Sequence, residues 1–99
     1  MSRILFTISY EISPEKREEY LVLVGDMKDH FINQKQKNYA VFEQHGKKNS
    51  FVEMFTCVSM EEYDALEDDQ DEKTQALVQR LEEFLDEGKM RYSTLIEVE

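Results

Sequence analysis

The chain has 99 residues, of which 40% are hydrophobic and 34% charged, and its formal net charge is −10. This length predicts one domain, spanning residues 1–99, with a small hydrophobic core. The single cysteine excludes an intramolecular disulfide and any multi-cysteine metal cluster. No apolar run approaches the ~18 residues of a membrane span, and no basic-then-apolar leader opens the chain. We therefore expect a soluble, cytoplasmic protein.

The negative charge is concentrated in the second half of the chain. Residues 1–50 hold eight Lys or Arg and seven Asp or Glu, whereas residues 51–99 hold four and fifteen. Residues 61–72 alone contain eight acids and no base. Such a surface repels phosphate groups, so we expect neither a nucleic-acid partner nor a membrane partner.

Residues 3–12 have the two-residue periodicity of a strand. One parity is strongly apolar and consists of Ile4, Phe6, Ile8, Tyr10 and Ile12. Ser13 and Pro14 then suit the cap and the first position of a helix that ends near residues 33–37. The predicted buried stripe of this helix is Tyr20, Leu23, Val24, Met27 and Phe31.

Residues 39–45 and 51–58 are predicted to be two strands of an antiparallel hairpin. The five residues between them, 46–50, include Gly46 and Asn49, which are typical of a turn. Ser59 and Glu62 have the spacing of a capping box, which predicts a short helix to about residue 67. The acidic run of residues 68–71 then breaks or bends this helix.

A further helix follows, capped by Asp69 or Asp71. Its predicted buried stripe is Thr74, Leu77, Val78, Leu81, Phe84 and Leu85. Gly88 is predicted to end it as the left-handed residue after the helix. Residues 90–98 form the last predicted strand. The order β-α-β-β-α-β predicts an α+β, ferredoxin-like fold, in which two helices cover one face of a four-stranded antiparallel sheet.

The other face of the sheet is predicted to be partly apolar. Both parities of the predicted strands carry apolar or small residues, among them Leu5, Thr7, Phe42, Met54 and Leu95. A fully solvated sheet face is instead polar and charged. We therefore expect this face to be covered by a second copy of the chain, in a homodimer.

Two segments resemble a known family. Residues 10–20, Tyr-Glu-Ile-Ser-Pro-Glu-Lys-Arg-Glu-Glu-Tyr, are similar to its first strand, turn and helix start. Residues 51–63 are similar to its third strand running into a Ser-x-Glu-x-aromatic helix. The chain thus resembles the antibiotic-biosynthesis-monooxygenase-like domains of the dimeric α/β-barrel superfamily. The resemblance implies a homodimer whose sheets form a barrel, and a cleft between sheet and helices in each subunit. The cleft residues that it implies are Phe6, Ile8, Phe55, Cys57 and Leu66.

Proteins of this family oxidise polycyclic aromatic compounds or degrade haem, often without a metal or flavin of their own. The haem-degrading branch has an Asn in the first strand, an aromatic residue after the third and a His in the next helix. Here residues 3–12 contain no Asn, Cys57 stands at the aromatic position and Leu66 at the His position. This disfavours haem degradation and leaves the catalytic residues unidentified.

The resemblance favours a cofactor-independent, monooxygenase-like protein that acts on a small apolar or aromatic ligand. The alternative is a non-catalytic ligand-binding or stress-related interaction module, and the sequence leaves open whether the protein is an enzyme. An RNA-recognition module has the same order of elements, but it requires a basic sheet, which the net charge argues against.

Few other residues suggest chemistry. His30 is predicted at a helix surface or boundary and His45 in a solvated turn, and neither has a second ligand at metal spacing. Glu43 and Glu53 would lie opposite one another if hairpin partners sum to 96, and on opposite faces if the register shifts by one. We expect both to be solvated or at the dimer interface. Cys57 is expected to be a buried, unreactive thiol, and residues 64–72 a solvated helix bend. No metal is predicted.

Overall fold

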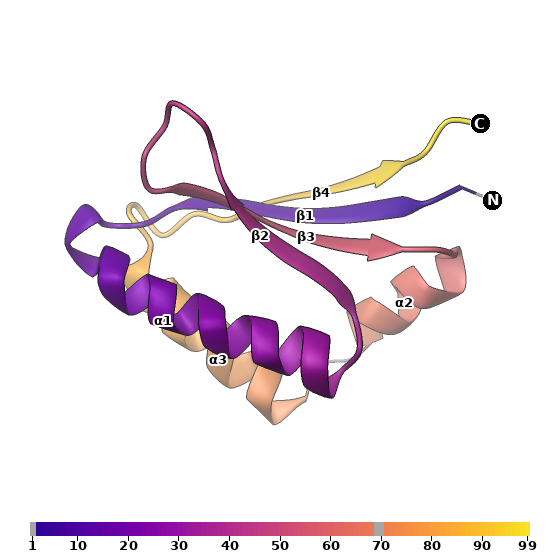
Figure 1. The fold of residues 1–99 in the computed structure, drawn as a ribbon, viewed down its shortest axis with the longest axis horizontal. Coiled ribbons are helices and arrows are strands. Elements are labelled where there is room, and N and C mark those ends of the chain that lie inside the picture. The colour runs from indigo at the N-terminus through magenta and orange to yellow at the C-terminus, as the bar shows by residue number, and fades with distance from the viewer. Residues whose placement is uncertain (1, 69–70) are drawn as a thin grey trace.

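The computed structural model describes residues 2–68 and 71–99. Its four strands are β1 (Ile4–Glu11), β2 (Asn38–Glu43), β3 (Ser50–Cys57) and β4 (Arg91–Ile96). Its helical segments are the turn η1 (Pro14–Lys16), α1 (Arg17–Lys28), the π-helical turn η2 (Asp29–Gln34), α2 (Met60–Asp68) and α3 (Glu72–Phe84). The strands form one antiparallel sheet in the order β2-β3-β1-β4. All the helices lie on one side of it (Figure 1). The predicted ferredoxin-like order is therefore confirmed.

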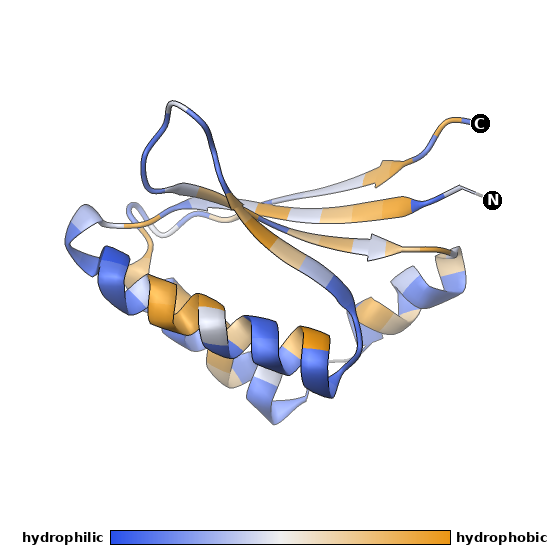
Figure 2. Ribbon diagram, in the orientation of Figure 1, coloured by the Kyte–Doolittle hydropathy of each residue, from blue (hydrophilic) through white to orange (hydrophobic). Residues whose placement is uncertain are grey.

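The core lies between the sheet and the helices α1 and α3. The apolar parity of β1 faces the helices, as predicted, with Ile4, Tyr10 and Ile12 buried and Phe6 and Ile8 half-buried. From α1, the side chains of Tyr20 and Leu23 are fully buried. Figure 2 shows that apolar residues recur along β1, whereas the helices alternate between polar and apolar residues.

The helix ends depart from the sequence prediction at two points. The Ser13 side chain makes no capping hydrogen bond; instead its carbonyl oxygen accepts from the Lys16 N–H at 2.9 Å and closes η1. Pro14 occupies the first helical position, as predicted. Gly88 has a left-handed φ of +72°, but α3 already ends at Phe84, so the glycine shapes the turn before β4 rather than the helix end. The chain leaves α3 early because Leu85 pairs with Ile12 in a β-bridge.

Asp71 caps α3, whereas the other candidate, Asp69, lies outside the described residues. The Thr74 N–H donates to Asp71 Oδ1 at 2.8 Å, and the ammonium of Lys35 lies 2.6 Å from Oδ2. Hydrogen bonds from Lys35 and Thr74 hold the pKa of Asp71 below its usual range. The Ser59 cap of α2 is also present, with the Glu62 N–H donating to Ser59 Oγ at 3.2 Å.

Asp71→Ala is expected to lower the free energy of unfolding by about 1 kcal/mol, because the first turn of α3 loses its acceptor. Urea unfolding would measure this. Asp64→Ala, which removes an exposed carboxylate within α2, is the matched control and should change stability by less than about 0.5 kcal/mol. Equal stability of the two variants would contradict the cap assignment.

The hairpin register differs from both sequence alternatives. Partners in β2 and β3 include Val41 with Glu53 and Glu43 with Phe51. Glu43 and Glu53 therefore share the helix-facing side but are not opposite one another. The turn sets this register, since the Gln44 N–H donates to the Ser50 carbonyl at 2.8 Å.

Candidate ligand-binding site

A cavity of about 240 Å³ lies between the helix-facing side of the sheet and the helices. Strands β1, β3 and β4 form one wall, and α2, α3, η2 and the residues just before β2 and β4 contribute the rest. The lining residues are Phe6, Ile8, Phe31, Lys37, Glu53, Phe55, Leu66, Thr74, Leu77, Val78, Leu81, Met90 and Tyr92. Of the five cleft residues implied by the sequence resemblance, the structure brings Phe6, Ile8, Phe55 and Leu66 together here.

Aromatic rings form much of the cavity wall. The Phe55 ring lies 6.3 Å from that of Phe6, 5.1 Å from that of Phe31 and 4.7 Å from that of Tyr39, between centroids. The Tyr92 ring stacks on Phe6 at 6.1 Å. Such walls suit an apolar and preferably planar molecule, because aromatic faces gain most from stacked and edge-to-face contacts.

Glu53 is the one carboxyl among the described residues that line the cavity. Its side chain is only 4% exposed, and the Tyr39 hydroxyl donates to Oε1 at 2.7 Å. Burial raises the pKa of the Glu53 carboxyl above its ordinary value of 4.5, against the opposing hydrogen-bond effects of Tyr39 and Tyr10. A carboxyl of this kind can give a proton to a bound molecule, and its conjugate base is stronger than an exposed carboxylate.

The expectation that Glu53 is solvated or at the dimer interface is wrong. Its strand parity places it under the helices, beside the buried Tyr39. Glu43, by contrast, is exposed at the end of β2 and forms a two-pronged pair with Arg17, at 2.6 and 2.9 Å. This guanidinium holds the pKa of Glu43 down at about 2. The two carboxyls therefore have opposite environments and do not share a proton.

Cys57 does not line the cavity. It is buried on β3 beyond Phe55, next to Leu66 and Glu62. Burial raises the pKa of its thiol, which agrees with the predicted unreactive cysteine.

His30 is 2% exposed, so its predicted place at the helix surface is wrong. Its Nε2 lies 2.9 Å from Thr74 Oγ1, and its Nδ1 has no hydrogen-bond partner among the described residues. With the buried Tyr20, Leu23 and Met27 of α1, His30 continues one helical stripe, since positions three and four apart share a helix face. His45 lies exposed in the hairpin turn, as predicted.

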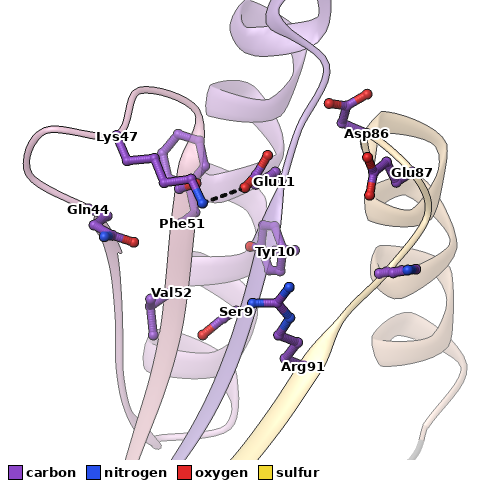
Figure 3. A pocket seen from close by; sticks show the side chains of 12 residues that line it. Ser9, Tyr10, Glu11, Gln44, Lys47, Phe51, Val52, Asp86, Glu87 and Arg91 are labelled. Carbon is purple, nitrogen blue, oxygen red and sulfur yellow. Dashed lines mark ion pairs between the residues drawn. The ribbon is translucent and has the colours of Figure 1, made fainter.

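A second cavity, of about 330 Å³, lies at the hairpin end of the sheet (Figure 3). It is lined by mixed charges, and its Lys47 ammonium is already paired with Glu11 at 2.8 Å. This compensation leaves little net attraction for a charged ligand. Among residues 2–68 and 71–99, no group of three or more His, Cys, Asp or Glu side chains is arranged to hold a metal ion. In the same ranges, no helix is long and apolar enough to cross a membrane.

Sequence reasoning missed several residues that the fold brings to the cavity, among them Lys37, Tyr92 and Glu53, and it missed the hydrogen bond between Tyr39 and Glu53. A charged residue between apolar neighbours in Phe-Val-Glu-Met-Phe was the available signal for Glu53. Its burial depends on the face that β3 turns to the helices. Lys37 precedes β2 in a polar stretch and carries no local signal.

Neither a protein-family model nor a curated protein matches the sequence. Solved structures do match the fold. A proposed antibiotic biosynthesis monooxygenase from Caulobacter crescentus is 13% identical, with a TM-score of 0.79 over 99% of this chain and 92% of that one. Another from Deinococcus radiodurans is 9% identical, with a TM-score of 0.77 over 97% and 93%. A NIPSNAP family protein from Agrobacterium tumefaciens is 20% identical, with a TM-score of 0.73 over 94% and 90%.

These likenesses define the class of fold. The chain has the ferredoxin-like architecture of these monooxygenase-like and NIPSNAP structures, and this fold agrees with the one that the sequence resemblance implied. At these levels of identity the likeness concerns the fold, and the chemistry rests on the residues of the cavity.

Proposed function

We propose that the protein is a homodimeric, monooxygenase-like protein that binds a small aromatic or apolar molecule in the 240 Å³ cavity, without a cofactor of its own. The observation that carries this proposal is the buried Glu53 carboxyl, hydrogen-bonded to Tyr39, on the floor of an aromatic cavity. Apolar walls around a few convergent polar groups are typical of ligand sites. The proposed activity of the Caulobacter crescentus fold neighbour supports the same class of reaction.

The reaction that fits this site is oxygenation of a phenolic ring. The ionised form of Glu53, which is a stronger base than an exposed carboxylate, accepts the hydroxyl proton and so raises the electron density of the ring. For 1-naphthol, the balanced reaction with O2 gives 1,4-naphthoquinone and water. A new C–O bond forms at the ring carbon para to the hydroxyl, the O–O bond breaks, and the second oxygen leaves as water. The ring supplies all the electrons, so no external reductant is required.

Oxygen uptake with 1-naphthol tests this function. Glu53→Gln is expected to lower the rate at least 100-fold, while calorimetry shows 1-naphthol still bound, because the amide keeps the size and one acceptor of the carboxyl. Glu61→Gln, which alters an exposed carboxyl of α2, is the matched control and should retain the rate. Uptake that is equal in wild type and Glu53→Gln would overturn the assigned role of Glu53.

A second candidate function is ligand binding without turnover. It is favoured by Cys57 and Leu66, which stand where the haem-degrading branch of the family has its aromatic residue and His. Binding of 1-naphthol without any oxygen uptake by the wild type would select this candidate. The absence of binding would overturn both.

The proposed homodimer forms through the sheet face opposite the helices. On this face the side chains of Phe42 and Leu95 are 52% and 51% exposed. Leu5, Met54 and Leu95 line a shallow surface hollow of about 430 Å³ on the same face. The edge strand β4 also exposes Tyr92 and Ile96 on its other side. Exposed apolar surface on an edge strand is usually covered in natural proteins.

Light scattering after gel filtration should give twice the chain mass of 11.8 kDa for the wild type. Leu95→Asp is expected to shift the protein to the monomer, because it places a charge inside the sheet-to-sheet contact. Val22→Asp, at a 65% exposed position on α1, is the control and should remain dimeric. A monomeric wild type would contradict the proposed dimer.

A further inference from the structure

Lys37 is the cation that borders the aromatic cavity. It stands one residue before β2 and has the strand parity of Tyr39 and Val41, the residues that face the helices. It is half-buried, and its backbone N–H donates to the Phe31 carbonyl at 2.7 Å, which fixes the start of its side chain beside the cavity wall. Among the described residues that line the cavity, Lys37 is the one cation and Glu53 the one carboxyl.

The charge of Lys37 is not compensated by a salt bridge within the described part of the chain. Other basic residues with defined partners, such as Lys35 with Asp71 and Lys47 with Glu11, are paired with carboxylates outside this cavity. Exposed lysines without partners are ordinary, since water solvates them. Lys37 differs because its surroundings include the apolar side chains of Phe55 and Leu66, while Glu62, in the adjoining hollow, forms no salt bridge with it within the described residues. There, an anion would be attracted more strongly than in bulk water.

Lys37 and Glu53 mark separate ends of the site. Glu53 pairs with Val41, four residues beyond Lys37, so the two positions lie about 13 Å apart along the strand direction. The flexible lysine side chain shortens this gap. A molecule of one or two fused rings therefore spans from the neighbourhood of Glu53 to the ammonium.

We infer that the cavity selects an aromatic monoanion, whose rings lie against Phe6, Phe31 and Phe55 and whose carboxylate pairs with Lys37. This inference rests on the proposed function, because it assumes that the cavity holds a ligand, and it adds the class of ligand. A molecule with two anionic groups is disfavoured, since Lys37 offers one positive charge. A cavity below the usual 300–1,000 Å³ range of ligand pockets also favours a small ligand.

Binding of 1-naphthoic acid and its neutral isostere 1-naphthamide, at pH 7 and low salt, tests the inference. The chain has no Trp, so naphthalene emission is observed against a low protein background, and calorimetry gives independent affinities. The wild type is expected to bind the acid at least tenfold more tightly than the amide. Lys37→Met should abolish this preference for the acid, whereas Lys37→Arg, which keeps the positive charge, should retain it. Lys48→Met, which removes an equal charge from the hairpin turn, should leave the ratio unchanged.

Each outcome decides a different statement. Equal affinities of the wild type for acid and amide would overturn the inference and leave the proposed binding function standing. A preference for the acid that persists in Lys37→Met would overturn the assignment to Lys37. If neither probe nor 1-naphthol binds, the proposed function fails, and the inference fails with it. Because the wild-type comparison needs no variant, it remains decisive even if Lys37→Met does not fold.

Discussion

The wild type is expected to lose stability as the pH rises above about 4.5, and Glu53→Gln is expected to prevent this loss. The native carboxyl has a raised pKa, mainly because it is buried, so the native state holds a proton that the unfolded chain releases from pH 4.5 upward. The contribution of Glu53 to the free energy of unfolding is therefore fully present below its pKa in the unfolded chain. It declines as the pH rises, until the pH passes the pKa of Glu53 in the native state. Within that window each pH unit removes about 1.4 kcal/mol from the free energy of unfolding.

The amide of the variant stays neutral at every pH and still accepts from Tyr39. Wild type and Glu53→Gln should thus have similar stability near pH 4.5, and the variant should become the more stable protein toward pH 8. Urea unfolding at intervals between pH 4.5 and 8.5 measures the difference. This range stays below the ordinary tyrosine pKa of 10, which burial raises further in Tyr39 and Tyr10.

In both proteins, exposed carboxyls change the free energy of unfolding with pH in the opposite direction to Glu53. The pKa values of Glu43 and Glu97 are lowered to about 2, chiefly by hydrogen bonds from Arg17 and Arg3, so their contributions disappear as the pH falls. Both proteins contain them, and the difference between the proteins isolates Glu53. Glu61→Gln should have the wild-type pH profile. A Glu53→Gln profile parallel to that of the wild type would show that burial does not raise the pKa of the Glu53 carboxyl.

Phe55→Ala is expected to cost about 3–5 kcal/mol of stability, a large fraction of what a small domain possesses. Phe55 is 5% exposed and has ring contacts with Phe6, Phe31 and Tyr39. Removing the ring leaves a void that three neighbouring aromatic groups cannot fill without leaving their own contacts. The variant should also bind 1-naphthol more weakly, because it loses one wall of the cavity.

Phe84→Ala separates these two effects. Phe84 is 8% exposed in α3 and belongs to the same core, but it does not line the cavity. Its removal should cost a similar free energy of unfolding, measured with urea, and should leave the 1-naphthol affinity of the folded protein unchanged. A loss below 1 kcal/mol for Phe55→Ala, or equal weakening of binding by both variants, would contradict the central place of Phe55 in the site.

Local patterns predicted most of the architecture. Period-two alternation identified β1 and its helix-facing residues, and helical spacing identified the buried Tyr20, Leu23 and Met27. Asp71 and Ser59 were recognisable as caps because a cap is a relation between residues three positions apart. The candidate cavity was predictable only in part: the family resemblance implied Phe6, Ile8, Phe55 and Leu66, and the alternation independently placed only Phe6 and Ile8 on the apolar parity.

The sequence by itself therefore determined the elements, their order and the apolar parity of β1, all of which depend on near neighbours. The tertiary structure alone decided the β2–β3 register, the burial of Glu53 and the place of Lys37 at the cavity. The register depends on a turn in which Gly46 and Asn49 both adopt left-handed φ angles, of +81° and +69°. A carboxyl in a strand is solvated or buried according to what covers its face, and α1 and α3 reach that face from distant parts of the chain. Short-range periodicity contains no information on such contacts.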